Sequence, residues 1–92
     1  MPKGIPREKP VQREIVRRYK IANGHLGKVI SMIESNEYCL DIVHQSLAVQ
    51  AALKKADELV LKNHLQTCVA DSIRKGEEKV AIEEIMGVLE KR

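Results

Sequence analysis

A stretch of about 38 residues between Asn36 and Gly76 contains no glycine or proline, and it restricts the possible folds more than any other feature. At about 1.5 Å per residue, one helix of this length would be a rod of roughly 55 Å, longer than a small domain needs. Such a helix is expected to pack against a copy of itself or another partner. Asn36 is its predicted N-cap and Gly76 its predicted C-terminal stop. Apolar and small residues recur along it at helical spacing, at Leu40, Val43, Leu47, Ala51, Leu53, Ala56, Val60, Leu65 and Val69.

Two shorter amphipathic patterns flank this stretch. Apolar residues in steps of three and four from Val11 to Ile33 predict a first helix, and the pattern from about Glu77 to Glu90 predicts a third. Aromatic residues make up only 2% of the chain, so the core must consist of aliphatic side chains, which suits helix packing. We therefore predict an all-α fold: a three-helix protomer with a long second helix.

The chain is short, and its N-terminal end is rich in proline and glycine. We interpret residues 1–10 as a flexible basic arm and residues 11–92 as a single helical domain. Because 92 residues bury only a modest core, we expect oligomerisation. No apolar run approaches the roughly 20 residues of a membrane span, and we find no secretory signal, so a cytoplasmic location is expected. There, Cys39 and Cys68 favour metal binding or redox chemistry over a structural disulfide.

The positive charge is concentrated in the first third of the chain. Residues 1–28 contain eight Lys or Arg and two Glu, whereas residues 29–68 contain three basic and five acidic residues. A basic segment on a nearly neutral body is typical of proteins that bind nucleic acid, although a solvated helix face can have the same composition. We expect DNA contacts from the basic residues of the first helix and from a lysine pair in the second. These residues are Arg13, Arg17, Arg18, Lys20, Lys54 and Lys55.

His64 and Cys68 are four residues apart, so a helix would place them on one face. Cys39 precedes His64 by 25 residues, about 37 Å along an unbroken helix, so one chain cannot bring all three to one ion. An antiparallel pair of such helices would place Cys39 of one chain beside the other two residues of its partner, twice per dimer. Two thiolates and an imidazole suit Cu(I), or Zn(II) with a fourth ligand. The same residues could instead be two buried cysteines and a surface histidine.

The segment from Glu37 to Val69 resembles the copper-sensing transcriptional repressor (CsoR) family, which has relatives that respond to nickel, cobalt or formaldehyde. The resemblance covers roughly residues 11–90 and includes the spacing of the three potential ligands. The shared features are the Tyr-Cys-x-Asp run from Tyr38 to Asp41, Gln45, Ala48–Val49, Ala52–Leu53 and the His64-Leu65-x-x-Cys68 motif.

This resemblance implies an antiparallel dimer that pairs again into a tetramer. It also implies a metal-responsive repressor that binds operator DNA in the metal-free form and is released by Cu(I). The implied Cu(I) ligands are Cys39, His64 and Cys68, with Tyr38 and Glu84 linked to the outer nitrogen of the histidine. No carboxylate pair, catalytic triad or phosphate loop occurs in the sequence, so we expect no enzyme activity.

The chain departs from the family pattern in its first helix. Ile21 stands where the family usually has an arginine and His25 where it has a glutamine, so a different set of cations could contact DNA. We interpret His25 and His44 as polar surface or interface residues rather than extra ligands. Two alternatives remain: a sensor of another inducer (formaldehyde, persulfide, Ni(II) or Zn(II)), or a helical metal-binding protein without DNA function.

Overall fold

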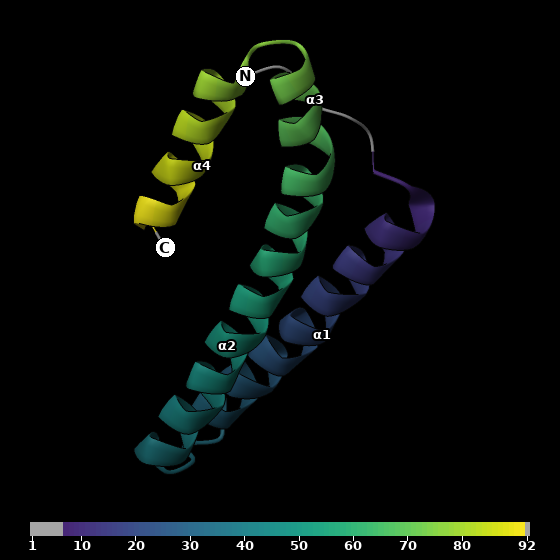
Figure 1. Ribbon diagram of the computed structural model, residues 1–92. Helices are drawn as coiled ribbons and strands as arrows, with labels where there is room; N and C mark the ends of the chain where they lie inside the picture. Colours follow the sequence, from purple (N-terminus) through teal and green to yellow (C-terminus); the bar gives the residue numbers. More distant parts are fainter. Residues whose placement is uncertain (1–6, 92) are drawn as a thin grey trace. The chain divides into compact units, whose positions relative to one another are not determined.

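The computed structural model describes residues 7–91, which form helices joined by short turns (Figure 1). This part of the chain contains no β-strand, and the all-α prediction is confirmed for it. The predicted long second helix corresponds to three elements that follow one another without a loop, one of them a π-helical turn. The elements are α1 (Lys9–Glu34), α2 (Cys39–His64), the π-helical turn η1 (Leu65–Val69), α3 (Ala70–Arg74) and α4 (Glu78–Lys91).

Helix α1 begins at Lys9, two residues before the predicted start at Val11. Pro10 lies in its first turn, where a backbone N–H would have no helical partner and its absence is tolerated. Residues 1–6 of the predicted arm lie outside the described residues.

The turns after α1 and after α3 use the same backbone motif. After α1, the N–H of Glu37 donates to Met32 O (3.0 Å), and Asn36 has a left-handed φ of 56°. After α3, the N–H of Glu77 donates to Ser72 O (2.7 Å), and Gly76 has a φ of 77°. Gly76 therefore ends this helix as predicted.

The prediction that Asn36 is the N-cap of the second helix is wrong. Asn36 is the left-handed residue that follows α1, a role that asparagine accepts more readily than most residues. Tyr38 immediately precedes α2, and its carbonyl accepts hydrogen bonds from the N–H groups of Asp41 and Ile42.

The chain divides into two compact units, and residues 8–60 form the larger one. In this unit α1 and α2 run antiparallel, side by side (Figure 1). Both helices bury small or aliphatic residues seven positions apart, a spacing typical of helices that pack along a continuous seam. These residues are Ile15, Ala22 and Val29 in α1, and Val49 and Ala56 in α2.

Polar contacts also connect the two helices of this unit. The Tyr19 hydroxyl donates to Asp57 Oδ1 at 2.5 Å, and His25 Nε2 lies 2.7 Å from Gln45 Oε1. This hydrogen bond raises the pKa of the Tyr19 phenol to about 12, because Asp57 accepts a hydrogen bond only from the protonated phenol.

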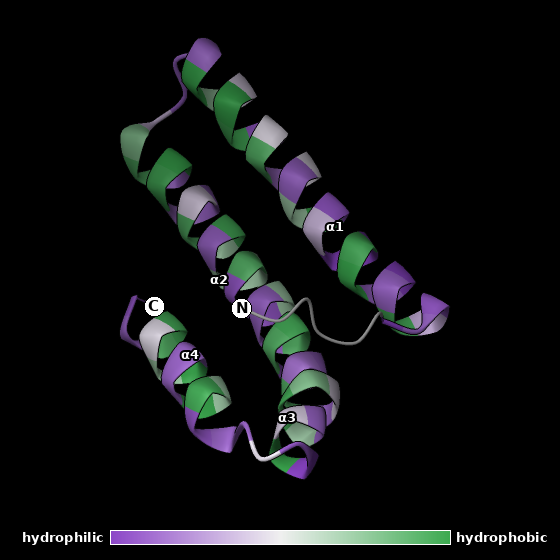
Figure 2. Cartoon of the chain, turned by 90° about the horizontal axis from the view of Figure 1, so that it is seen from above, coloured by the Kyte–Doolittle hydropathy of each residue, from purple (hydrophilic) through white to green (hydrophobic). Residues whose placement is uncertain are grey.

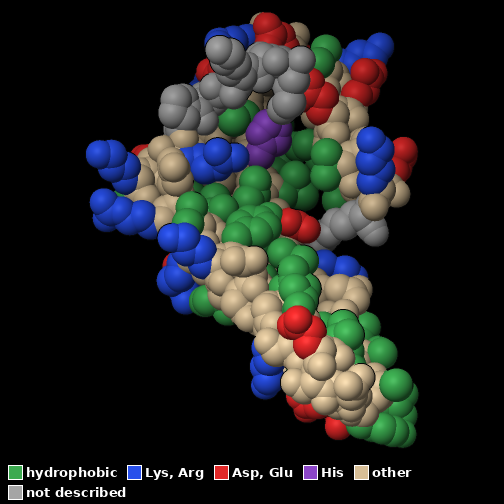
Figure 3. Space-filling view, turned by 180° about the vertical axis from the view of Figure 1, so that it is seen from behind, with side chains coloured by type: hydrophobic (Ala, Val, Ile, Leu, Met, Phe, Trp, Pro, Cys, Tyr) green, Lys and Arg blue, Asp and Glu red, His purple; other side chains and the backbone are tan. Residues whose placement is uncertain are grey.

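The hairpin of residues 8–60 leaves a large apolar area exposed. Hydrophobic residues are frequent where α1 and α2 are joined (Figure 2), and green side chains cover part of this end in the space-filling view (Figure 3). The exposed residues there are Leu26, Ile30, Ile33, Leu40, Val43 and Leu47.

The second unit contains the chain from Leu61 onward. Within it η1, α3 and α4 pack together, and Val69 and Ala81 are its buried apolar residues. Across residues 7–91, no helix has both the length and the apolarity needed to cross a membrane.

Candidate metal centre and basic face

Two of the three predicted metal ligands are the end residues of one helix. Cys39 is the first residue of α2 and is exposed, whereas His64 is its last residue and is half-buried. These positions are 25 residues apart, which is about 37 Å along a continuous helix. Metal–ligand bonds to sulfur or nitrogen are about 2.0–2.3 Å long, so one ion cannot contact both ends of α2.

The third predicted ligand, Cys68, lies within the π-helical turn η1 and is half-buried. In such a turn each backbone N–H bonds to the carbonyl five residues earlier, and π-turns frequently occur at functional sites. The Thr67 hydroxyl donates to the carbonyl of Asn63 at 2.8 Å and lies 3.6 Å from Cys68 Sγ. The turn therefore sets the position of this cysteine one turn after His64.

The two residues predicted to support His64 belong to different units of the chain. Glu84 lies in α4, half-buried and in the same unit as His64 and Cys68. Tyr38 belongs to the unit of residues 8–60, and its side chain is 65% exposed. Within residues 7–91 of one chain, no three His, Cys, Asp or Glu side chains are grouped to hold a metal ion. The ligand and supporting roles stay predictions.

Three of the six predicted DNA-contact residues lie around one pocket between α1 and α2. Arg17 and Arg18 come from α1, and Lys55 comes from α2. Ile21 and Ala52 complete the lining of this pocket, which we call the basic pocket. The fold thus gathers cations that are about 37 positions apart in the sequence.

Glu14 binds both arginines of the basic pocket, a contact not predicted above. Arg17 donates from Nε and Nη2 to the two carboxylate oxygens of Glu14, at 2.9 and 2.7 Å. Arg18 Nε donates to the same carboxylate at 3.1 Å. These hydrogen bonds lower the pKa of Glu14 to about 2, and its charge raises the pKa of Arg17. The signal was present in the sequence, since Glu14 precedes the arginines by three and four residues.

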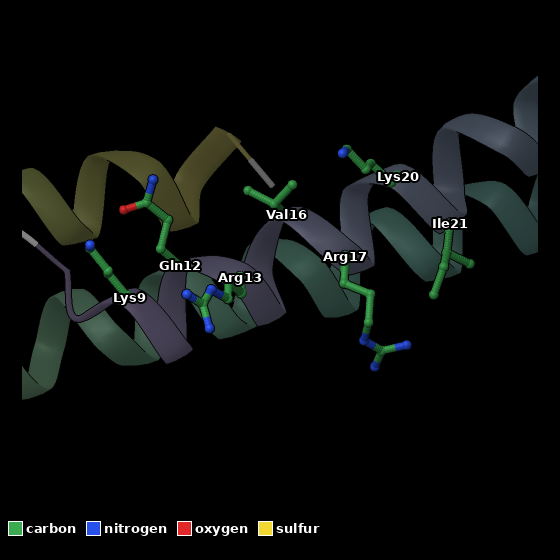
Figure 4. Close-up of a pocket in the computed structure, with 7 residues that line it drawn as sticks. All are labelled: Lys9, Gln12, Arg13, Val16, Arg17, Lys20 and Ile21. Carbon is green, nitrogen blue, oxygen red and sulfur yellow. The ribbon is translucent and has the colours of Figure 1, made fainter.

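The other predicted DNA-contact residues lie on the exposed surface. Lys54 is exposed on α2, while Arg13 and Lys20 line a second, open pocket on α1 (Figure 4). Arg17 and Lys20 leave the helix in different directions in this view, so the positive charge extends over more than one face of α1. Lys and Arg side chains lie along the α1 side in Figure 3.

The amino-acid sequence of the chain matches a known protein family. Residues 11–91 match the family of metal-sensitive transcriptional repressors. The chain belongs to this family. The resemblance found in the sequence is therefore confirmed.

Individual relatives are about 40% identical to this chain in sequence. The chain is 40% identical over 75 residues to the copper-sensing transcriptional repressor CsoR of Mycobacterium ulcerans, a match that covers 82% of this chain and 64% of the relative. It thus spans a little under two thirds of that relative's length. It is 38% identical over 78 residues to CsoR of Bacillus subtilis, covering 85% of this chain and 77% of the relative.

The fold matches a solved member as well. The crystal structure of the copper-sensing repressor CsoR with Cu(I) from Geobacillus thermodenitrificans superposes with a TM-score of 0.88 at 38% identity. The match covers 95% of this chain and 91% of the other. The helical architecture predicted from the sequence is thus shared with a metal-sensitive repressor.

Ile21 and His25, the two residues of α1 that depart from the family pattern, have different surroundings in the structure. Ile21 is 54% exposed and lines the basic pocket, so an aliphatic side chain stands among the cations. His25 contacts Gln45 across the α1–α2 interface, and His44 is exposed on α2. His25 therefore lies at the interface between α1 and α2, and His44 lies on the surface of α2.

Proposed function

We propose that the chain is a copper-responsive transcriptional repressor that binds operator DNA without metal and leaves it when Cu(I) binds. The observation that carries this proposal is the position of Cys39 and His64 at opposite ends of one continuous helix, with Cys68 one turn further on. Such an arrangement makes a three-ligand site only when a second chain is present. The copper-sensing relatives support the choice of metal.

The donor set of this shared site fits Cu(I). In an antiparallel dimer, Cys39 of one chain would meet the partner's His64 and the partner's Cys68, and the two-fold axis would create a second site. Two thiolates and one imidazole are soft ligands that favour Cu(I) over harder ions such as Ni(II), and Zn(II) would need a fourth ligand. Tyr38 and Glu84 would then fix the orientation of His64 through its outer ring nitrogen.

The exposed apolar end of the 8–60 hairpin supports self-association. Side chains such as Ile30, Leu40 and Leu47 are more than half exposed there, and contiguous apolar patches on soluble proteins usually mark interaction surfaces. We infer a homodimer, or a homotetramer made from two dimers.

The basic pocket supports DNA binding. Arg17, Arg18 and Lys55 come from two helices to one place, where they would contact phosphates of the DNA backbone. Arg13, Lys20 and Lys54 would extend this contact along the duplex. A protein that acts on operator DNA would work in the cytoplasm.

The division of the chain into two units suggests how the two sites communicate. The DNA-contact residues and Cys39 belong to residues 8–60, whereas His64, Cys68 and Glu84 belong to the other unit. Ligation would therefore tie the DNA-contact unit of one chain to the other unit of its partner. If this connection disfavours the DNA-bound arrangement, DNA must weaken Cu(I) binding by the same factor.

A titration under anaerobic conditions tests this function. Fluorescence anisotropy of a labelled promoter fragment should report binding of the metal-free protein and its release at one Cu(I) per chain. The Cys39→Ala variant should still bind the fragment but should not respond to Cu(I). Binding of Cu(I) without any change in DNA affinity would refute the regulatory proposal, and absence of DNA binding would refute the repressor function.

The exposure of Cys39 favours a second class of inducer, one that reacts covalently with a thiol. An accessible thiol could react with a small electrophile such as formaldehyde, or with a persulfide. Cys68→Ala separates the two mechanisms, because it removes a metal ligand but leaves the reactive Cys39. A response that survives in Cys68→Ala would favour the covalent inducer over Cu(I).

A further inference from the structure

The arginines of the basic pocket already have an anionic partner within their own helix. Glu14 accepts two hydrogen bonds from Arg17 and one from Arg18, all from α1. The three side chains are partly exposed, with 40% of Glu14, 57% of Arg17 and 43% of Arg18 accessible to solvent. They can therefore exchange one anionic partner for another.

The contacts differ between the two arginines. Arg17 uses Nε and Nη2, which form the edge that normally binds a phosphate in bidentate fashion. Arg18 uses only Nε, so its two terminal nitrogens are not engaged by Glu14. A DNA phosphate would thus have to displace Glu14 from Arg17, while it could approach Arg18 with Glu14 in place.

The carboxylate also reduces the charge available to DNA. Because the pKa of Glu14 is about 2, Glu14 is ionised at every pH near neutrality. One negative charge beside two positive charges leaves a net charge of about +1 where the arginines alone would give +2. This opposition does not depend on pH in the physiological range.

We propose that Glu14 is an internal competitor for DNA phosphate that limits the affinity of the metal-free repressor for DNA. This proposal rests on the DNA-binding function proposed above. Binding of one ligand typically changes the affinity for another by about 5- to 150-fold, so a repressor held too tightly on DNA would not be released by its inducer. Glu14 would keep the DNA affinity within the range that metal binding can reverse.

The variant Glu14→Gln tests the proposal with little change in shape. Removal of the competing charge should tighten binding to the promoter fragment by about 3- to 10-fold. It should also steepen the dependence of log affinity on log salt by about 1, the effect of one additional phosphate contact. Both quantities come from the same anisotropy titrations at several salt concentrations, and circular dichroism confirms that the variant is folded.

Glu34→Gln is the matched control. Glu34 is the last residue of α1, 20 positions from Glu14, and its substitution makes the same change in net charge. The distance along the helix is about 30 Å, well beyond the screening length of about 8 Å at physiological salt. Glu34→Gln should therefore leave DNA affinity nearly unchanged.

A second comparison shows whether the effect passes through the arginines. In the Arg17→Ala/Arg18→Ala background, Glu14→Gln should no longer increase DNA affinity, because the groups it releases are absent. An equal gain in both backgrounds would overturn the proposal, as would weaker binding of Glu14→Gln alone. If the unchanged protein binds no duplex DNA, the DNA-binding function itself fails. If it binds and Glu14→Gln has no effect, only the role of Glu14 fails.

Discussion

A mixture of two defective variants tests whether the metal site is shared between subunits. Cys39→Ala removes the thiol at the start of α2, and His64→Ala removes the imidazole at its end. Neither variant alone can form a complete set of three ligands. In a mixed antiparallel dimer, Cys39 of the His64→Ala chain meets the partner's His64 and the partner's Cys68, so one of the two sites is complete.

The size of the effect follows from the helix and from symmetry. Since about 37 Å of helix separates Cys39 from His64, no complete site can form within one chain. Random exchange of equal amounts of the two variants gives mixed dimers for about half of the population, each with one complete site of two. The mixture should therefore bind about a quarter as much Cu(I) tightly as the unchanged protein does.

The assay is a competition titration with a Cu(I) chelator under anaerobic, reducing conditions. The two variants are unfolded and refolded together so that their chains exchange, and gel filtration with mass spectrometry shows that mixed dimers have formed. A mixture of His64→Ala and Cys68→Ala is the matched control. Both changes lie on the same side of the shared site, so its mixed dimers have no complete site.

Two results would refute the shared site. Absence of tight Cu(I) binding in the first mixture, with mixed dimers present, would show that the ligands do not meet in antiparallel fashion. Equal binding in both mixtures would show that the site tolerates the loss of one ligand, so Cys39 and His64 would not be jointly required.

Three further substitutions test the α1–α2 hairpin, the basic pocket and the turn after α3. Tyr19→Phe removes the hydrogen bond to Asp57 and should lower the free energy of unfolding by about 1 kcal/mol near neutral pH in urea titrations. Because the pKa of Tyr19 is raised to about 12, the folded state favours the neutral phenol. The resulting stabilisation is complete below pH 10. The difference in unfolding free energy from Tyr19→Phe should therefore disappear as the pH rises toward 12. Ile21→Arg adds a cation to the basic pocket and should strengthen DNA binding. The slope of log affinity against log salt should steepen by about 1. An unchanged slope would show that DNA does not contact this pocket. Gly76→Ala forces a side chain into a left-handed conformation with no neighbour within 4 Å, so thermal unfolding should show a loss of about 1 kcal/mol from backbone strain alone.

The sequence predicted the helices well because their apolar residues follow one period throughout. The two helix-ending turns show one position where this reasoning succeeds and one where it fails. Gly76 is predictable because glycine is the usual residue at a left-handed position, whereas Asn36 occupies the equivalent position after α1 and not the predicted N-cap position. Asparagine favours both positions, so its sequence context did not distinguish them.

The π-helical turn could not be predicted from the apolar pattern. Residues 65–69 contain no glycine or proline, and their spacing fits a continuous α-helix. Only Thr67 gave a local signal, since a hydroxyl that bonds the carbonyl four residues earlier often bends a helix. The turn matters for the candidate site because it contains Cys68.

The proposed metal site and the basic pocket differ in how far the sequence can predict them. The spacing of Cys39 and His64 predicts a site between two chains because a continuous helix excludes any site within one chain. The basic pocket depends on how α1 packs against α2, which no local pattern specifies, yet Glu14 could have been identified from its spacing to Arg17 and Arg18.

Glu14 and the proposed metal site would act on DNA binding in the same direction. If Glu14 weakens the contact of the basic pocket with DNA, the shared metal site needs to supply only a modest opposing effect to release the repressor. Glu14→Gln should then leave the affinity for Cu(I) of the DNA-free protein unchanged, because Glu14 is far from any proposed ligand in sequence and lies on α1. In the presence of promoter DNA the same variant should need more Cu(I) for release, in proportion to its gain in DNA affinity. A change in Cu(I) affinity without DNA would show that Glu14 acts on the metal site itself and not on phosphate binding.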